Sequence, residues 1–120
     1  MLPETLGNTN IKRIVNFYSK IFRKKYGFSP RVSYPKIGAL YKPILQDMSE
    51  YQIALLILIH FEWKGTTGDD DFVHKRLSQN CFPLEWLPRN INPYVAYITN
   101  SLNIDFNNEE AVKEIVNEQL

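Results

Sequence analysis

Apolar residues recur at helical spacing in the first part of the chain. They stand three or four positions apart through the segment from Ile11 to about Tyr26, at residues 11, 14, 15, 18, 21 and 22. That period is typical of an amphipathic α-helix with one buried side. Residues 7–10, Gly-Asn-Thr-Asn, are typical of a loop that runs into a helix cap, and Gly27 suits the position after a helix C-terminus. The pattern predicts a helix over about 11–26.

A second helix is expected over about 36–47. Pro30 and Pro35 keep residues 28–34 extended before it, because the residue ahead of a proline avoids the helical region. Pro43 falls inside the segment and removes a backbone donor. We therefore expect it to kink or split this helix.

A third helix is expected from about Ser49 to Trp63. Residues 49–52, Ser-Glu-Tyr-Gln, match a capping box at its start. Its middle is apolar nearly all round, which is typical of the central helix of a small bundle. Leu56 and Ile59 are therefore expected in the core.

The second half of the chain mixes helical and irregular segments. Asp69–Asp71 would give a short helix through Leu77 an acidic N-terminus, which the helix dipole favours. Residues 80–91 contain Pro83 and Pro88 among aromatic and leucine side chains. This composition predicts an irregular segment pressed onto the bundle.

Two more helices are expected towards the C-terminus. Residues 92–93, Asn-Pro, are typical of a cap followed by proline at the first helical position, and the helix is expected to run to about Leu102. Asn107 or Asn108 is expected to cap the last helix, ahead of two glutamates in its first turn.

These elements predict an all-α fold. We expect a single domain over residues 1–120, built as a small helical bundle of about five or six helices with an irregular Pro/aromatic segment. A chain of 120 residues fits one domain and can bury roughly two thirds of its unfolded surface. Its hydrophobic share of 44% is too high for a disordered chain.

The sequence also favours a cytoplasmic protein that does not enter a membrane. Cys81 is the only cysteine, so no internal disulfide is possible. Residues 1–4 have none of the basic and apolar pattern of a signal peptide. The apolar run over 53–61 is far shorter than the ~20 residues that cross a bilayer.

Positive charge is gathered in the first third of the chain. Residues 5–46 hold nine basic and no acidic residues, whereas residues 47–120 hold five basic and twelve acidic ones. The basic part could pack on the acidic part within the molecule. Alternatively, it forms a surface that meets an acidic partner.

The cations of the first predicted helix share one side of it. Five of them fall within an arc of about 120° opposite the apolar side. The candidate nucleic-acid-binding residues are these five with three that follow: Lys12, Arg13, Lys20, Arg23, Lys24, Lys25, Arg31 and Lys36. Such residues neutralise phosphates and release counterions. Tyr18, Tyr26, Phe28 and Tyr34 lie between them and could stack on bases. An acidic protein surface or a merely solvated helix face would give the same pattern.

No pattern indicates catalysis, a metal or a cofactor. Asp69–Asp71 and His74 could bind a metal, but carboxylates ahead of a helix usually serve as caps. Cys81 lies in no nucleophile motif and is expected to be a buried, inert thiol. The sequence has no phosphate loop, dinucleotide, GxSxG or HExxH motif. His60 is expected in the core with a backbone partner. We expect no enzyme activity and no small-molecule substrate.

Several stretches together resemble a known family. They are residues 14–22 with 25–30 (KYGFSP), 34–42 (YPKIGALYK), 48–52 (MSEYQ), Phe72-Val73, 82–84 and 90–92. This order resembles small helical domains of phage replication accessory proteins, of the helicase-loader or replisome-organiser kind.

The resemblance implies an all-α accessory protein in a phage-infected bacterial cytoplasm, acting in replication or transcription. Its partners would be nucleic acid, DNA rather than RNA, or a replication or transcription protein. The alternative is a protein–protein adaptor that binds an acidic surface of a polymerase or helicase without touching nucleic acid.

Overall fold

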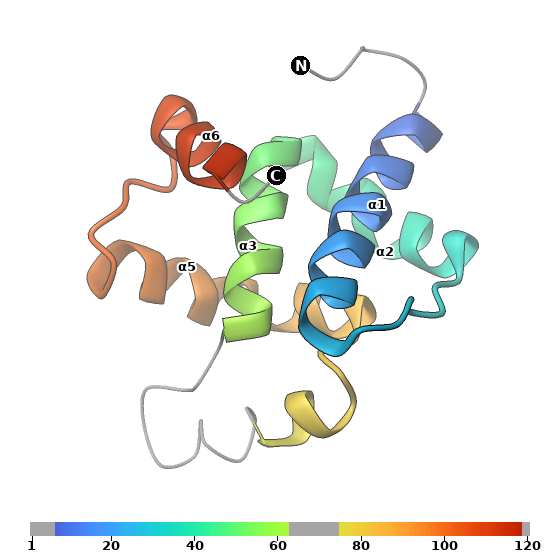
Figure 1. Ribbon diagram of the computed structural model, residues 1–120. Coiled ribbons are helices and arrows are strands. Elements are labelled where there is room, and N and C mark those ends of the chain that lie inside the picture. The colour runs from blue at the N-terminus through green and yellow to red at the C-terminus, as the bar shows by residue number, and fades with distance from the viewer. Residues whose placement is uncertain (1–6, 63–74, 119–120) are drawn as a thin grey trace.

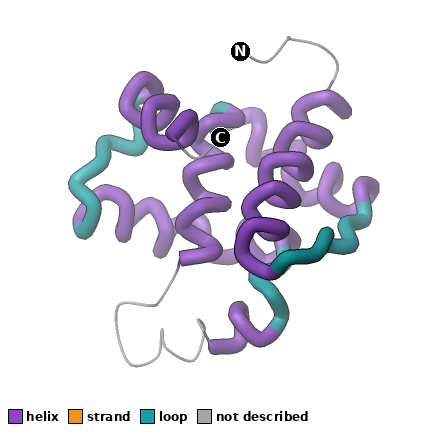
Figure 2. The backbone as a smooth tube through the Cα atoms, viewed as in Figure 1, coloured by secondary structure: helices purple, strands orange, loops and turns teal. Residues whose placement is uncertain are grey.

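Helices make up the fold throughout the residues that the computed structural model describes, 7–62 and 75–118 (Figures 1 and 2). Within these residues there is no strand, and the fold consists of six helices and a short helical segment at residues 75–79, which confirms the predicted all-α class. The helices are α1 (Gly7–Tyr26), α2 (Tyr34–Asp47), α3 (Glu50–Glu62), the 3₁₀ helix η1 (Leu84–Asn90), α5 (Ile91–Asn100) and α6 (Glu109–Glu118). Residues 75–79, around Leu77, are also helical, but the predicted start of that helix at 69–71 lies outside the described residues.

Helix α3 occupies the centre, with α1 and α2 on one side of it and α5 and α6 on the other (Figure 1). It packs against α1, α5, α6 and η1. Leu56 is fully buried and Ile59 is 6% exposed, so both are core residues as predicted. The capping box is confirmed in both directions. The Ser49 amide donates to Gln52 Oε1 at 2.9 Å, and the Gln52 amide donates to Ser49 Oγ at 3.2 Å.

Helix α1 buries the predicted apolar side and ends where predicted. Gly27 follows its last residue at a φ of 83° and donates its amide to the Arg23 carbonyl at 2.9 Å. Its start was predicted wrongly, because residues 7–10 are helical rather than a loop. These residues are poor helix formers, but they extend an existing helix and so need no new nucleus.

Helix α2 is continuous through Pro43, so of the two predicted effects, a kink or a split, the split is wrong. The proline leaves the Ala39 carbonyl without its helical donor, but Ala39 is exposed and water can reach it. The helix also begins at Tyr34 rather than 36. Pro35 lies in the first turn, where its missing N–H costs no hydrogen bond.

Residues 80–91 are more regular than predicted. They form a turn and then the 3₁₀ helix η1, whose Leu84 and Leu87 are buried. Cys81 and Phe82 adopt left-handed φ values of 59° and 48° in the turn, and the Phe82 amide donates to the Leu77 carbonyl at 2.7 Å. The turn buries the Phe82 ring and leads directly into η1.

Three helices donate hydrogen bonds to successive carbonyls of this turn. Tyr18 Oη of α1 donates to the Phe82 carbonyl at 2.9 Å, and Tyr41 Oη of α2 donates to the Leu84 carbonyl at 2.7 Å. His60 Nε2 of α3 lies 2.8 Å from the Pro83 carbonyl, which lies between them in sequence. Burial raises the pKa of both tyrosine hydroxyls, which keeps them protonated donors.

The last two helices differ from expectation only at their ends. Helix α5 begins at Ile91 after Asn90, so Pro93 is its third residue and the predicted cap at Asn92 is wrong. No first-turn amide has a helical acceptor, which lets proline stand at any of these positions. The helix also ends at Asn100, before the predicted 102. Helix α6 is capped as predicted, since Asn108 Oδ1 accepts from the Ala111 amide at 3.2 Å.

Leu56→Ala should lower the free energy of unfolding by about 2–5 kcal/mol, because the side chain is fully buried in α3. Urea denaturation followed by circular dichroism measures this difference. A loss below about 1 kcal/mol would contradict the central position of α3.

Gly38→Ala should stabilise the protein by about 0.5–1 kcal/mol. Gly38 lies inside α2, and a Cβ built there meets no atom within 4 Å. The methyl group therefore adds helix propensity without a clash. Thermal melts of the two proteins test this, and a lower melting temperature for the variant would contradict it.

Candidate nucleic-acid interface

The predicted basic residues are exposed to different degrees and face different neighbours. Lys12, Arg23 and Lys24 are exposed, and Lys20 is half-buried. Arg31, in the loop before α2, and Lys36, on α2, are also exposed. Within the described part of the chain, none of these six forms an ion pair. Their charges are therefore available to a partner, whereas those of Arg13 and Lys25 have contacts within the protein.

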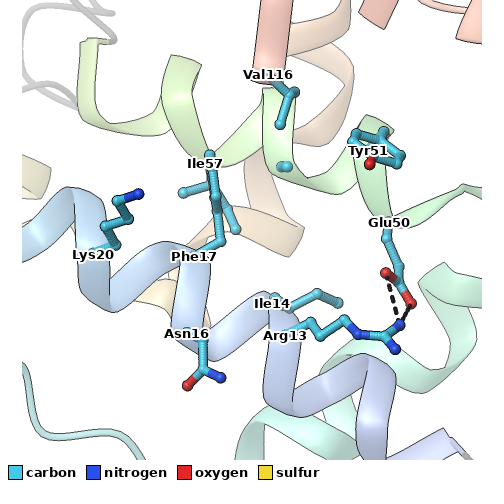
Figure 3. A pocket seen from close by; sticks show the side chains of 10 residues that line it. Arg13, Ile14, Asn16, Phe17, Lys20, Glu50, Tyr51, Ile57 and Val116 are labelled. Atoms are coloured by element: carbon cyan, nitrogen blue, oxygen red, sulfur yellow. Dashed lines mark hydrogen bonds and ion pairs between the residues drawn. The ribbon is translucent and has the colours of Figure 1, made fainter. Parts of the chain in front are cut away.

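Arg13 is ion-paired with an acidic residue of α3. Its Nη1 lies 3.0 Å from Glu50 Oε1 and 3.3 Å from Oε2, and the two side chains are only 15% and 17% exposed (Figure 3). The pair joins α1 to the first turn of α3. For this residue, the interpretation that basic and acidic parts pack on each other is correct.

Lys25 is exposed, but its ammonium group contacts the end of α3. Its Nζ lies 3.4 Å from the Phe61 carbonyl and 5.4 Å from the centroid of the Phe82 ring. A cation at the C-terminal turn of a helix satisfies carbonyls there and interacts favourably with the helix dipole. Lys25 therefore stabilises the fold.

A groove between α1 and α2 brings together two cations and an exposed aromatic ring. It has a volume of about 620 Å³. Lys12 lines it from α1, while Tyr34 and Lys42 line it from α2. Tyr34 is 47% exposed. Gly38 and Ala39 form part of the α2 wall, so no bulky side chain narrows the groove there.

Lys42 was not among the predicted site residues. It belongs to the acid-free stretch, which is the only signal in the sequence, because only the packing of α1 on α2 brings it to the same groove as Lys12. Lys36 does not line this groove, although it lies on the same helix. The cations that were predicted to share one side of α1 therefore lie in different places. Lys12 faces α2, whereas Lys20 and Lys24 line hollows on the α3 side.

The predicted stacking residues also divide between core and surface. Tyr18 is 3% exposed, and its ring packs on Phe61 with the centroids 5.3 Å apart, so the prediction that it is a surface stacking residue is wrong. It lies on the apolar side of α1, where the helical period already placed it. Tyr26 is half-buried against Phe22, whereas Phe28 is exposed beside it.

His60 is a core residue with a backbone partner, as predicted. Its Nε2 faces the Pro83 carbonyl at 2.8 Å, and its Nδ1 lies 2.6 Å from Tyr94 Oη. Because a carbonyl only accepts, Nε2 carries the proton and Nδ1 accepts from Tyr94. Burial lowers the pKa of the imidazole from 6.5 to about 4, so the ring is neutral at pH 7. Cys81 is half-buried rather than fully buried, which corrects that prediction.

No protein family, curated protein or solved structure matches this chain. The resemblance to phage replication proteins therefore stays an expectation. Over residues 7–62 and 75–118, no helix has both the length and the apolar character that a bilayer crossing needs. The same residues contain no cluster of three or more potential metal ligands of the His, Cys, Asp and Glu types. The Asp69–Asp71 and His74 candidate lies outside the described residues.

The neutral state of His60 predicts a stability loss in mild acid. The unfolded imidazole, with a pKa near 6.5, takes up a proton more readily than the folded one, with a pKa of about 4. The contribution of neutral His60 to the free energy of unfolding is therefore complete above about pH 7. About 3 kcal/mol of stability is lost as the pH falls towards 4. Urea unfolding of wild type and His60→Gln between these limits isolates the effect. Equal pH dependence in the two proteins would contradict it.

Proposed function

We propose that this protein is a small, non-catalytic nucleic-acid-binding accessory protein whose contact surface is the groove between α1 and α2. The observation that carries the proposal is the joint lining of that groove by Lys12, Lys42 and the exposed Tyr34. Cations on both walls suit a phosphate backbone, and the exposed ring that lines the same groove suits a base.

Electrostatics around the groove support an anionic ligand. No acidic residue occurs over 5–46, which includes all of α1 and all of α2 except its last residue, Asp47. Arg23 and Arg31 add exposed positive charge from the same part of the chain. Each phosphate neutralised by such a residue releases condensed counterions, which favours binding without sequence specificity.

The aromatic component favours single strands over duplex. Stacking of a base on an aromatic ring contributes about 1–3 kcal/mol, and it requires a base that is free of its own stack. Tyr34 is 47% exposed, so its ring offers such a surface without any rearrangement of the core. The proposed ligand is therefore single-stranded DNA.

The resemblance to phage replication accessory proteins adds a biological setting to this proposal. In that setting the protein would act in replication or transcription, in the cytoplasm of an infected bacterium. The competing function is an adaptor that uses its cations to bind an acidic protein, and the salt dependence of nucleic-acid binding separates the two.

Binding of a fluorescent single-stranded oligonucleotide, measured by anisotropy, should weaken steeply with salt. Each phosphate contact contributes about −0.7 to the log–log slope. Lys12→Gln with Lys42→Gln should therefore weaken binding and make the slope shallower by roughly one to two units. Tyr34→Ala should weaken single-strand binding more than duplex binding, because only the former loses a stacked base.

The matched control is Lys75→Gln, an exposed lysine outside the basic region, which should bind like wild type. No binding of either DNA or RNA up to tens of micromolar at roughly 150 mM salt would reject the nucleic-acid function. Equal weakening by Lys75→Gln and by the groove variants would reject the groove as the contact surface.

A further inference from the structure

A second groove runs along the outer side of α3, between α1 and α6, and is distinct from the proposed nucleic-acid site. It consists of two adjoining hollows of about 320 Å³ and 530 Å³. The first lies along residues 50–57 of α3 and the second along residues 55–62. Figure 3 shows Phe17 and Ile57 in the first hollow, with Lys20 at one end and the Arg13–Glu50 pair at the other.

The floor and walls of this groove are apolar side chains that the core leaves partly exposed. Leu58 of α3 lies in the floor, Phe17 and Ile21 form the α1 wall, and Ile115 lies on the α6 side; all four are only partly buried. Ala54 also lines the first hollow, and its methyl group leaves space there that a larger side chain would fill. The hollows span about three turns of α3, or ~16 Å, which matches the length over which a docked helix presents its anchors.

One wall of the groove is positively charged. Lys20 lines the first hollow and Lys24 the second, one helical turn apart on α1. Neither forms an ion pair within the described residues. Lys25 of α1 and Glu62 of α3 also line the second hollow, while Glu50 in the first is paired with Arg13. The α1 edge of the apolar channel therefore carries the positive charge, and it complements a helix with an apolar side and acidic residues on the flank that faces α1.

We propose that this groove binds an amphipathic helix of an acidic protein partner, with its carboxylates directed towards Lys20 and Lys24. The acidic helix α6 of this chain cannot itself fill the groove, because its apolar side already packs in the core through Val112 and Val116. The proposal does not depend on the nucleic-acid function, since Lys12, Tyr34 and Lys42 do not line this groove. The protein would then carry two separate binding surfaces, one between α1 and α2 and the other beside α3.

The probe is a displayed library of helical peptides with leucine fixed at i, i+4, i+7 and i+11 and with flanks randomised among Glu, Lys, Gln and Ala. Selection on the wild-type protein should enrich Glu on one flank. Selection on the double variant Lys20→Glu with Lys24→Glu should enrich Lys on that flank. The enriched wild-type peptide should bind the double variant about tenfold more weakly, from the loss and reversal of two partly exposed ion pairs.

Two controls separate this groove from the rest of the surface. Lys36→Glu, an exposed change that touches neither hollow, should bind the peptide like wild type. Lys12→Gln with Lys42→Gln should also keep peptide binding while losing oligonucleotide binding, so the two proposals can fail independently. Leu58→Glu should abolish peptide binding, and circular dichroism checks that it remains folded.

Four outcomes would overturn the proposal. The library yields no enriched peptide, or the enriched flank charge is the same for wild type and the double variant, or Leu58→Glu binds the peptide like wild type while folded. If sedimentation velocity shows a dimer that Leu58→Glu abolishes, the groove belongs to a second copy and the proposal is likewise wrong. If Leu58→Glu does not fold, the charge swap at Lys20 and Lys24 alone decides.

Discussion

Helix α3 is apolar on nearly every side, and each neighbouring helix buries its own apolar face against it. Leu55, Leu56 and Ile57 are consecutive and all essentially inaccessible, which is possible only when neighbours cover several faces at once. Burial of each such side chain stabilises the folded state by about 1.5–3 kcal/mol. Helices α1, α5, α6 and η1 meet this requirement together, so the position of each depends on the others. The two hollows beside α3 lie where α1 and α6 leave part of its surface uncovered.

Local signals in the sequence predicted the helices well. The capping box at Ser49 and the glycine at 27 act within one turn of chain, so the pattern of residue types was sufficient to find them. The errors are also local and physical. Pro43 is tolerated because Ala39, whose carbonyl loses its helical donor, is exposed to solvent. The exposure of a residue depends on tertiary packing, so a few neighbouring residues in the sequence do not predict it.

The candidate site could be predicted only in outline. The sequence locates the positive charge on α1, but a helical wheel gives angles without neighbours. It therefore could not separate Arg13, which meets Glu50, from Lys12, which shares a groove with Lys42 of another helix. Tyr18 carried two contradictory assignments, apolar side and surface ring, and its burial in the core decided between them. The structure divides these cations among a contact within the protein, the groove between α1 and α2, and the apolar groove beside α3.

The three carbonyls of residues 82–84 are acceptors whose donors come from three different helices. The donors bind main-chain oxygens, so the side chains at 82–84 can change without removing an acceptor. A change in chain length has the opposite effect, because inserting or deleting one residue moves all three oxygens out of register together. Related sequences should therefore keep the length of this turn and the donors at 18, 41 and 60, while the buried side chains at 82 and 84 need only remain apolar. That length signature offers a way to find distant relatives whose residue-by-residue similarity has been lost.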